Sequence, residues 1–169
     1  MNVNGIKNEV SVTKTQAFAA VTHCIQGSEL VTQIFGCWPS FQNAEIHWLR
    51  LTNSHSEQGV VPTIEFQLHS WEMTNEVSPQ GYYVQRNNIL VHFRFREIDN
   101  LLLYDFNCEN AILRLSISPL ADPQLRPKYK VEIKSARGLG GSFTCRDITV
   151  LSVQPCDEEG NPCSKNQES

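Results

Sequence analysis

The sequence predicts a mainly β protein with a minor helical part, in which about seven to nine antiparallel strands form a curled sheet, a sandwich or a partial barrel. Apolar and polar residues alternate with a period of two over much of the chain after Phe41, which is typical of strands with one buried face. Turn-forming residues separate these stretches at short intervals. No helical pattern long enough for a crossover connection lies between them, so parallel βαβ units are not expected.

Length and composition predict one globular domain. The chain has 169 residues, of which 40% are hydrophobic and 19% charged, and this composition argues against a largely disordered protein. We expect the domain to cover residues 1–153, with a flexible start at 1–13 and an acidic, disordered tail at 154–169. No apolar run is long enough to span a membrane, and the polar N-terminus does not resemble a secretory signal, so a cytoplasmic protein is expected.

The six cysteines are expected to be reduced thiols. They are irregularly spaced and include no C-x-x-C pair, which argues against both a disulfide framework and a zinc site. Cys156 and Cys163 fall in the predicted tail, where we expect them to be exposed.

Two short helices are predicted before the strands. Apolar residues recur at three- and four-residue steps over residues 14–25. A second helix should begin after Ser28, a favourable N-cap residue, and end at Gly36, because glycine readily adopts the left-handed conformation that terminates helices. Neither helix carries an obvious catalytic group.

Alternating stretches define the strands and their buried faces. The stretch 45–51 is apolar on both faces, which predicts a strand covered on both sides. In the other stretches, the residues expected to face the core are Ile64, Phe66 and Leu68; Val91, Phe93 and Phe95; Leu113, Leu115 and Ile117; and Tyr129, Val131 and Ile133. Lysines alternate with the last set, which favours an edge strand because lysine discourages pairing with other chains.

Short turns connect the predicted strands. Ser78-Pro79-Gln80-Gly81 fits a type I turn, with proline second and glycine fourth. Asn87-Asn88 is predicted to form a tight hairpin, because asparagine tolerates the left-handed backbone conformation.

The net charge of −4 is concentrated in the predicted tail. Two further segments, 51–85 and 97–113, contain acidic residues and no Lys or Arg, whereas 124–140 is basic. If the two acidic segments are neighbours in the fold, the domain has an acidic face. A general affinity for nucleic acid is not expected, because it requires an excess of basic residues.

No pattern of catalytic residues stands out. The chain lacks the G-x-S-x-G, H-E-x-x-H and phosphate-loop motifs. His69 and His92 are predicted on outward strand faces; if these strands are adjacent, the two rings form a cross-strand pair that His47 or a glutamate would complete as a metal site. Solvated surface histidines are the simpler interpretation, so we predict no enzyme, no metal and no cofactor.

One segment resembles a known family. Residues 34–46, Ile-Phe-Gly-Cys-Trp-Pro-Ser-Phe-Gln-Asn-Ala-Glu-Ile, are similar to the F-G-x-W-P-S-F-H-D-A-E-V signature of the immunity protein 50 family of bacterial polymorphic toxin systems. A structural role is predicted for the motif residues Phe35, Gly36, Trp38, Pro39, Ser40, Phe41 and Glu45. Shorter matching stretches at 72–74, 81–84, 92–95, 106–107 and 140–146 extend the resemblance over about residues 27–155.

The chain departs from the signature at Gln42-Asn43, where the family commonly has His-Asp. Gln and Asn keep the hydrogen-bonding shape but lose titration and strong metal affinity. A function that depends on His-Asp would be lost here. The simpler interpretation is that the pair orients the loop entering the first strand, because the turn hydrogen bonds of Asn need no charge.

The resemblance implies a protein that neutralises a cognate toxin by stoichiometric binding to its C-terminal toxic domain, with no contact to nucleic acid or membrane. Aromatic anchors and acidic side chains are expected to carry such binding, so the candidate contact residues are Trp71, Glu72, Glu76, Tyr82, Tyr83, Asp99 and Asp105. Each also has a plainer interpretation as an ordinary surface or core residue. The alternative function is a small-ligand or carbohydrate-binding β module, with Trp71, Tyr82 and Tyr83 as a stacking platform.

Overall fold

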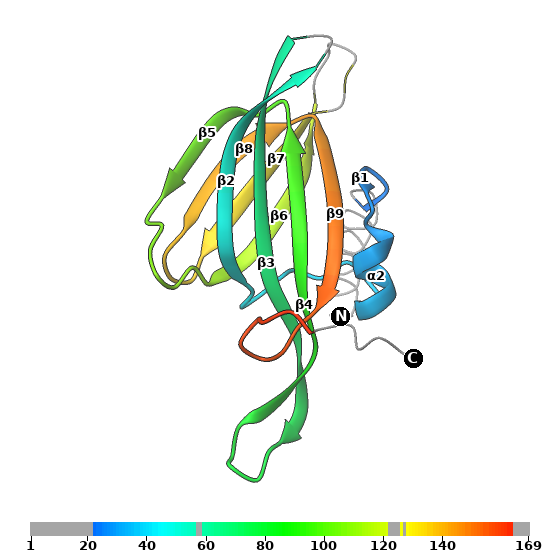
Figure 1. Ribbon diagram of the computed structural model, residues 1–169, viewed down its shortest axis with the longest axis vertical. Helices are drawn as coiled ribbons and strands as arrows, with labels where there is room; N and C mark the ends of the chain where they lie inside the picture. The colour runs from blue at the N-terminus through cyan, green and yellow to red at the C-terminus, as the bar shows by residue number, and fades with distance from the viewer. Residues whose placement is uncertain (1–21, 57–58, 122–125, 127, 164–169) are drawn as a thin grey trace, which may run out of the picture.

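The strands form two sheets that face each other across one core (Figure 1). The computed structural model describes residues 22–56, 59–121, 126 and 128–163. One sheet has the strand order β1-β9-β4-β3-β2 and the other the order β5-β8-β7-β6. All neighbouring strands are antiparallel except β1 and β9, which are parallel. The mainly β prediction is confirmed, in the form of two open sheets.

The five-stranded sheet contains β1 (Ile25–Gln26), β2 (Glu45–Ser56), β3 (Gly59–Val77), β4 (Tyr83–Arg96) and β9 (Asp147–Pro155). The four-stranded sheet contains β5 (Asp99–Tyr104), β6 (Ile112–Leu120), β7 (Lys128–Ser135) and β8 (Gly140–Cys145). A short helix, α2 (Glu29–Phe35), lies beside β9 (Figure 1). Within the described part of the chain, no helix is long and apolar enough to cross a membrane.

Gly36 ends α2 as predicted, with φ of 74° and its N–H donating to the carbonyl of Thr32. Ser28 occupies the N-cap position but makes no capping bond, because its backbone is already helical and its hydroxyl donates to the carbonyl of Thr22 at 3.0 Å. Most of the helix predicted at 14–25 lies outside the described residues. Its last residue, Ile25, pairs with β9 instead.

The core is formed by residues that alternate along the strands as the sequence predicts. Those buried from β3, β4 and β7 are Ile64, Phe66, Leu68, Val91, Phe93, Phe95, Tyr129, Val131 and Ile133. Phe95 and Phe143 meet edge to face across the two sheets, with ring centroids 5.1 Å apart. Each large apolar side chain buried in this way contributes about 1.5–3 kcal/mol, so the sheet–sheet interface is the main source of stability.

Local irregularities make several strand predictions wrong. A bulge between Ile112 and Arg114 buries Ile112 and leaves Leu113 exposed. A second bulge, in the β3–β4 pairing, accommodates the left-handed Asn87 inside a strand, so Asn87 is not in a hairpin turn. The stretch 45–51 is not covered on both faces as predicted, because β2 is an edge strand in which His47 and Leu51 are exposed.

The lysine-rich strand β7 is not an edge strand. It lies between β8 and β6, and two of its lysines are balanced by acidic neighbours. Lys130 contacts Glu132 at 2.7 Å and Lys128 contacts Asp99 at 3.3 Å. Pairing with these carboxylates removes the unbalanced charge that would favour an edge position.

Residues 154–163, assigned to the tail by composition, are part of the fold. Pro155 at the end of β9 pairs with Ile89 of β4, and the N–H of Cys156 donates to the carbonyl of Asn88. A turn then folds back so that Cys156 pairs with Pro162. We call residues 156–163 the C-terminal turn. Proline, glycine and acidic residues are as common in tight turns as in tails, so composition alone did not reveal it.

The side chain of Asp157 organises the C-terminal turn. Its carboxylate accepts hydrogen bonds from the backbone N–H groups of Glu159 and Asn161. Cys156 is therefore buried, contrary to the sequence prediction, whereas Cys163 is exposed as expected. No disulfide joins any of the six cysteines, all of which lie in the described part of the chain.

β3 and β4 continue beyond the sandwich as a projecting hairpin, which we call the arm (residues 71–86; Figure 1). Its strands pair Glu72 with Arg86 and Val77 with Tyr83. The predicted turn at 78–81 closes the tip, where the N–H of Gly81 donates to the carbonyl of Ser78 at 2.9 Å.

Candidate protein-interaction site

The arm exposes apolar side chains that the sandwich does not cover. The exposed fractions of Met73, Val77, Tyr82 and Tyr83 are 51%, 58%, 75% and 63%. β3 and β4 are longer than the body of the sheet requires, so these residues extend into solvent (Figure 1). A group of exposed aromatic and aliphatic side chains is the usual mark of an interaction surface.

The arm is held by its own hydrogen bonds. The hydroxyl of Thr74 donates to the carbonyl of Val84 at 2.8 Å, and the N–H of Ser78 donates to the carbonyl of Tyr82 at 2.7 Å. Arg86 makes an exposed ion pair with Glu76 at 2.6 Å, which contributes about 0–1 kcal/mol. The hairpin therefore presents its exposed side chains in a defined arrangement.

A groove of about 480 Å³ lies at the base of the arm. One wall is the loop that carries the family-like motif, which we call the signature loop (residues 36–43), together with Phe35 at the end of α2. The other wall is residues 70–73 of β3, where the arm begins. The fold thus places the motif directly beside two of the candidate contact residues, Trp71 and Glu72.

The signature loop is anchored in the core by an aromatic cluster. Trp38, Phe41 and Phe93 contact one another edge to face, with ring centroids 5.5–6.1 Å apart. The loop also joins the two sheets, because the carbonyl of Ser40 accepts a hydrogen bond from the N–H of Leu115 in β6. These contacts fix the wall of the groove.

The structure indicates a conformational role for Gln42-Asn43. Asn43 has φ of 64°, in the left-handed region that asparagine and aspartate tolerate better than other non-glycine residues. Its N–H donates to the carbonyl of Ile112 at 2.8 Å, which orients the entry to β2. Both side chains are exposed and line the groove. Asparagine can therefore replace the family's aspartate at this turn without loss of the backbone geometry.

Trp71 and the two tyrosines do not form one stacking platform. The ring of Trp71 is half-buried against His69, with centroids 4.9 Å apart. The tip pair Val77–Tyr83 lies six residues further along β3, which corresponds to about 20 Å of strand. A single sugar ring cannot contact both ends, so this arrangement does not favour the carbohydrate-binding alternative.

Asp99 and Asp105 lie apart from the arm, at the two ends of β5. A hydrogen bond from the N–H of Asn100, together with the ion pair to Lys128, holds the pKa of the Asp99 carboxyl below its usual range. Asp105 is exposed, with φ of 60°. The structure therefore brings together only the candidate contact residues of the arm.

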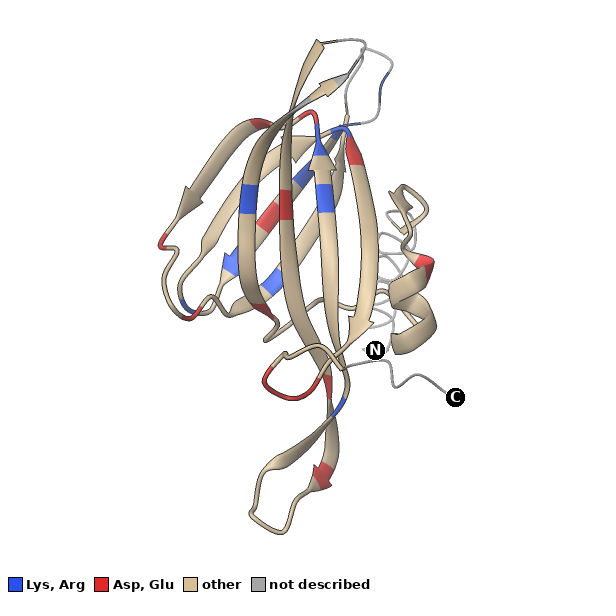
Figure 2. Ribbon diagram, in the orientation of Figure 1, with Lys and Arg blue, Asp and Glu red and all other residues tan. Residues whose placement is uncertain are grey.

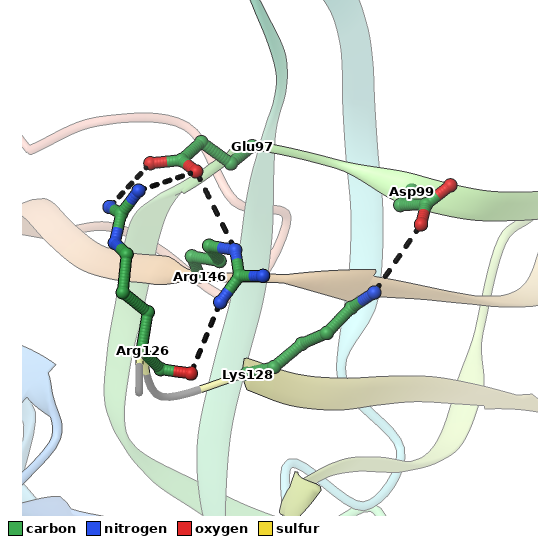
Figure 3. A network of polar contacts seen from close by, with 5 residues as sticks. All are labelled: Glu97, Asp99, Arg126, Lys128 and Arg146. Carbon is green, nitrogen blue, oxygen red and sulfur yellow. Dashed lines mark hydrogen bonds and ion pairs between the residues drawn. The ribbon is translucent and has the colours of Figure 1, made fainter. Parts of the chain in front are cut away.

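The second acidic segment, 97–113, is largely neutralised by the basic segment of the same chain. Glu97 contacts Arg126 at 2.8 Å and Arg146 at 3.7 Å, and the separate Asp99–Lys128 pair lies nearby (Figure 3). Glu109 pairs with Arg137. The conditional prediction of one acidic face built from both segments is therefore wrong.

The two candidate histidines do not meet. His92 lies against Trp48 and contacts Glu65 at 3.3 Å, whereas His69 lies against His47, with ring centroids 5.5 Å apart. His69 lies on the outward face of its strand as predicted, but it is only 3% exposed because the C-terminal turn covers it. Among the described residues, no three His, Cys, Asp or Glu side chains converge in the way a metal site requires.

The stability of the C-terminal turn is expected to depend on pH through His69. Burial lowers the pKa of His69 below 6.5, so the folded protein binds fewer protons than the unfolded chain in this range. The stabilising contribution is present above pH 6.5 and is lost as the pH falls through the folded-state pKa. We expect the free energy of unfolding to decrease between about pH 7.5 and pH 5.5, and to decrease less in H69Q. Denaturant titrations at several pH values measure this, and equal slopes for both proteins would contradict it.

Comparison with family models matched residues 27–156 to the model described as immunity protein 50. The matched region includes the signature loop, strands β2 to β9 and the arm. Comparisons with curated proteins and with solved structures found no match. Because the family model covers most of the chain, it confirms the family resemblance that the sequence indicated. The chain belongs to the immunity protein 50 family and is an immunity protein.

Proposed function

We propose that the protein neutralises a cognate bacterial toxin by binding it in a stoichiometric complex, through the arm and the groove at its base. The observation that carries this proposal is the exposure of Tyr82 and Tyr83 at the end of a hairpin that projects from the sandwich. Tyrosine is enriched among the residues that dominate binding energies at protein interfaces. Exposed tyrosines on a preformed hairpin lose little conformational freedom when a partner covers them.

The position of the groove also supports the arm as the binding surface. Its position between the signature loop and the start of the arm makes the arm and loop one continuous region of the molecule. A partner that covers the arm can insert a side chain into the groove, where Phe35 and Met73 are among the lining residues. We therefore propose Trp71, Glu72, Glu76, Tyr82 and Tyr83 as contact residues. We propose the C-terminal toxic domain as the partner and the bacterial cytoplasm as the place of binding.

The direct test is capture of the toxin. The full-length immunity protein is expressed with each candidate C-terminal toxin domain encoded in the same genome, and copurification and light scattering are measured. We expect one domain to form a one-to-one complex and the growth defect that it causes to disappear on co-expression. Absence of any complex with a toxin of its own genome would overturn the proposal.

A further inference from the structure

We propose that the docking surface formed by the arm and the groove receives a cationic surface of the partner, so that the toxin domain presents a basic patch there. This inference rests on the proposed function and specifies the chemistry of the partner. The apolar arm provides the docking surface, and the distribution of charge around it identifies the occupant.

Acidic side chains from three separate segments surround the base of the arm. We call them the acidic collar: Glu45, Glu72, Asp157, Glu158 and Glu159. Glu45 lies opposite His69 in the β2–β3 pairing, and the C-terminal turn begins where Cys156 bonds to Asn88 at the start of the arm. Figure 2 shows acidic positions on this turn and on the arm.

Among the described residues, the charge of the acidic collar is not balanced by ion pairs. Within the described residues, no Lys or Arg forms an ion pair with a collar carboxylate, although Glu97, Asp99 and Glu109 all have such partners. Arg86 is the basic residue of the arm; it lies opposite Glu72 in the strand pairing, but its ion pair is with Glu76, which lies outside the collar. The fold thus pairs Glu97, Asp99 and Glu109 with basic side chains, whereas the collar carboxylates form no ion pair with a described Lys or Arg.

Local hydrogen bonds favour the ionised form of one collar carboxylate and hold a second carboxylate in position. Hydrogen bonds from Asn161 lower the pKa of Asp157 below its usual range, so this carboxylate stays charged to lower pH. The carboxylate of Glu72 accepts a hydrogen bond from the amide of Asn87 at 3.0 Å, which holds it at the mouth of the groove. The negative charge is therefore fixed beside the apolar contact residues.

Coulomb interactions then select the partner. An acidic rim around apolar anchors attracts a basic protein surface, speeds its association and repels nucleic acid and anionic lipid. The hydroxyls of Tyr82 and Tyr83 and the carboxylate of Glu72 can accept hydrogen bonds from lysine or arginine side chains. A basic toxin surface satisfies both the apolar and the charged part of this site.

The test measures binding of the captured toxin domain by calorimetry and its association rate by interferometry, at low and high salt. The triple variant E72Q/E158Q/E159Q removes three exposed collar charges. The matched control E29Q/D105N/E132Q removes three exposed charges elsewhere. We expect the collar variant to bind about tenfold more weakly or worse at low salt, mainly through slower association, and salt to reduce the difference. The control should bind like the wild type, and melting temperatures verify folding.

The outcomes separate the two proposals. Binding that is insensitive to salt and to the collar variant overturns the basic patch and leaves toxin neutralisation intact. If the collar and control variants weaken toxin binding equally, the collar is not the site that attracts the toxin. If the wild-type protein forms a dimer and the collar variant is a monomer, the surface binds a second copy of the chain. That result overturns this inference. Failure of every toxin domain to bind overturns the proposed function itself.

Discussion

Replacing Tyr82 and Tyr83 together by alanine is expected to weaken toxin binding by about 2–4 kcal/mol, roughly 30- to 1,000-fold in Kd. Their exposed fractions, 75% and 63%, show that the free protein gains little from these rings. Truncation should therefore change the stability of the free protein by less than about 0.5 kcal/mol. The loss should appear in the complex, where the rings are covered. Calorimetric titration of the toxin domain into the variant, beside thermal unfolding, measures both effects.

The matched control removes a similar apolar area away from the arm. Leu102 and Phe106 are each 59% exposed, in β5 and in the connection that follows it. L102A/F106A should bind the toxin as the wild type does. If L102A/F106A loses binding and Y82A/Y83A does not, the contact surface lies near β5 and the arm is not the binding site.

Replacing Phe93 by alanine is expected to lower the free energy of unfolding by about 3–5 kcal/mol and the melting temperature by on the order of 10 °C. Phe93 is fully buried, and its ring contacts those of Trp38, Phe41, Phe66 and Phe95. Its loss leaves a cavity where the signature loop meets the five-stranded sheet. Chemical denaturation followed by circular dichroism gives the change in free energy.

The same substitution at an exposed position provides the control. F106A truncates a phenylalanine that is exposed to solvent, so it should change the free energy of unfolding by less than about 0.5 kcal/mol. The large effect of F93A is attributed to the aromatic cluster that anchors the signature loop, so a cost near that of F106A would contradict the packing described here. If F93A remains folded, we expect weaker toxin binding as well, because the wall of the groove is displaced.

Much of the fold could be predicted because burial imposes a local pattern. Along β3 and β4, every second residue faces the core, so Phe66 and Phe93 were identifiable from their spacing. Gly36 and the turn at 78–81 were predictable because particular backbone conformations favour particular residues. The candidate contact residues of the arm lie close together because they occupy one stretch of sequence, from Trp71 to Tyr83. The family was recognisable from the order of the residues in the signature.

The tertiary structure decided which segments are neighbours. Lys128 and Asp99 are 29 residues apart and meet only because β5, β8 and β7 are adjacent in the four-stranded sheet. The same applies to the C-terminal turn over His69 and to the groove, whose two walls come from distant segments. Sequence alone therefore determined the core faces of β3, β4 and β7 and the turn at 78–81, since these depend on each residue and its nearest neighbours. The burial of His69 and Cys156 depends on the tertiary structure, because segments distant in the sequence cover them. The choice among alternative strand pairings depends on the whole chain, and it placed the carboxylates of the acidic collar beside the arm.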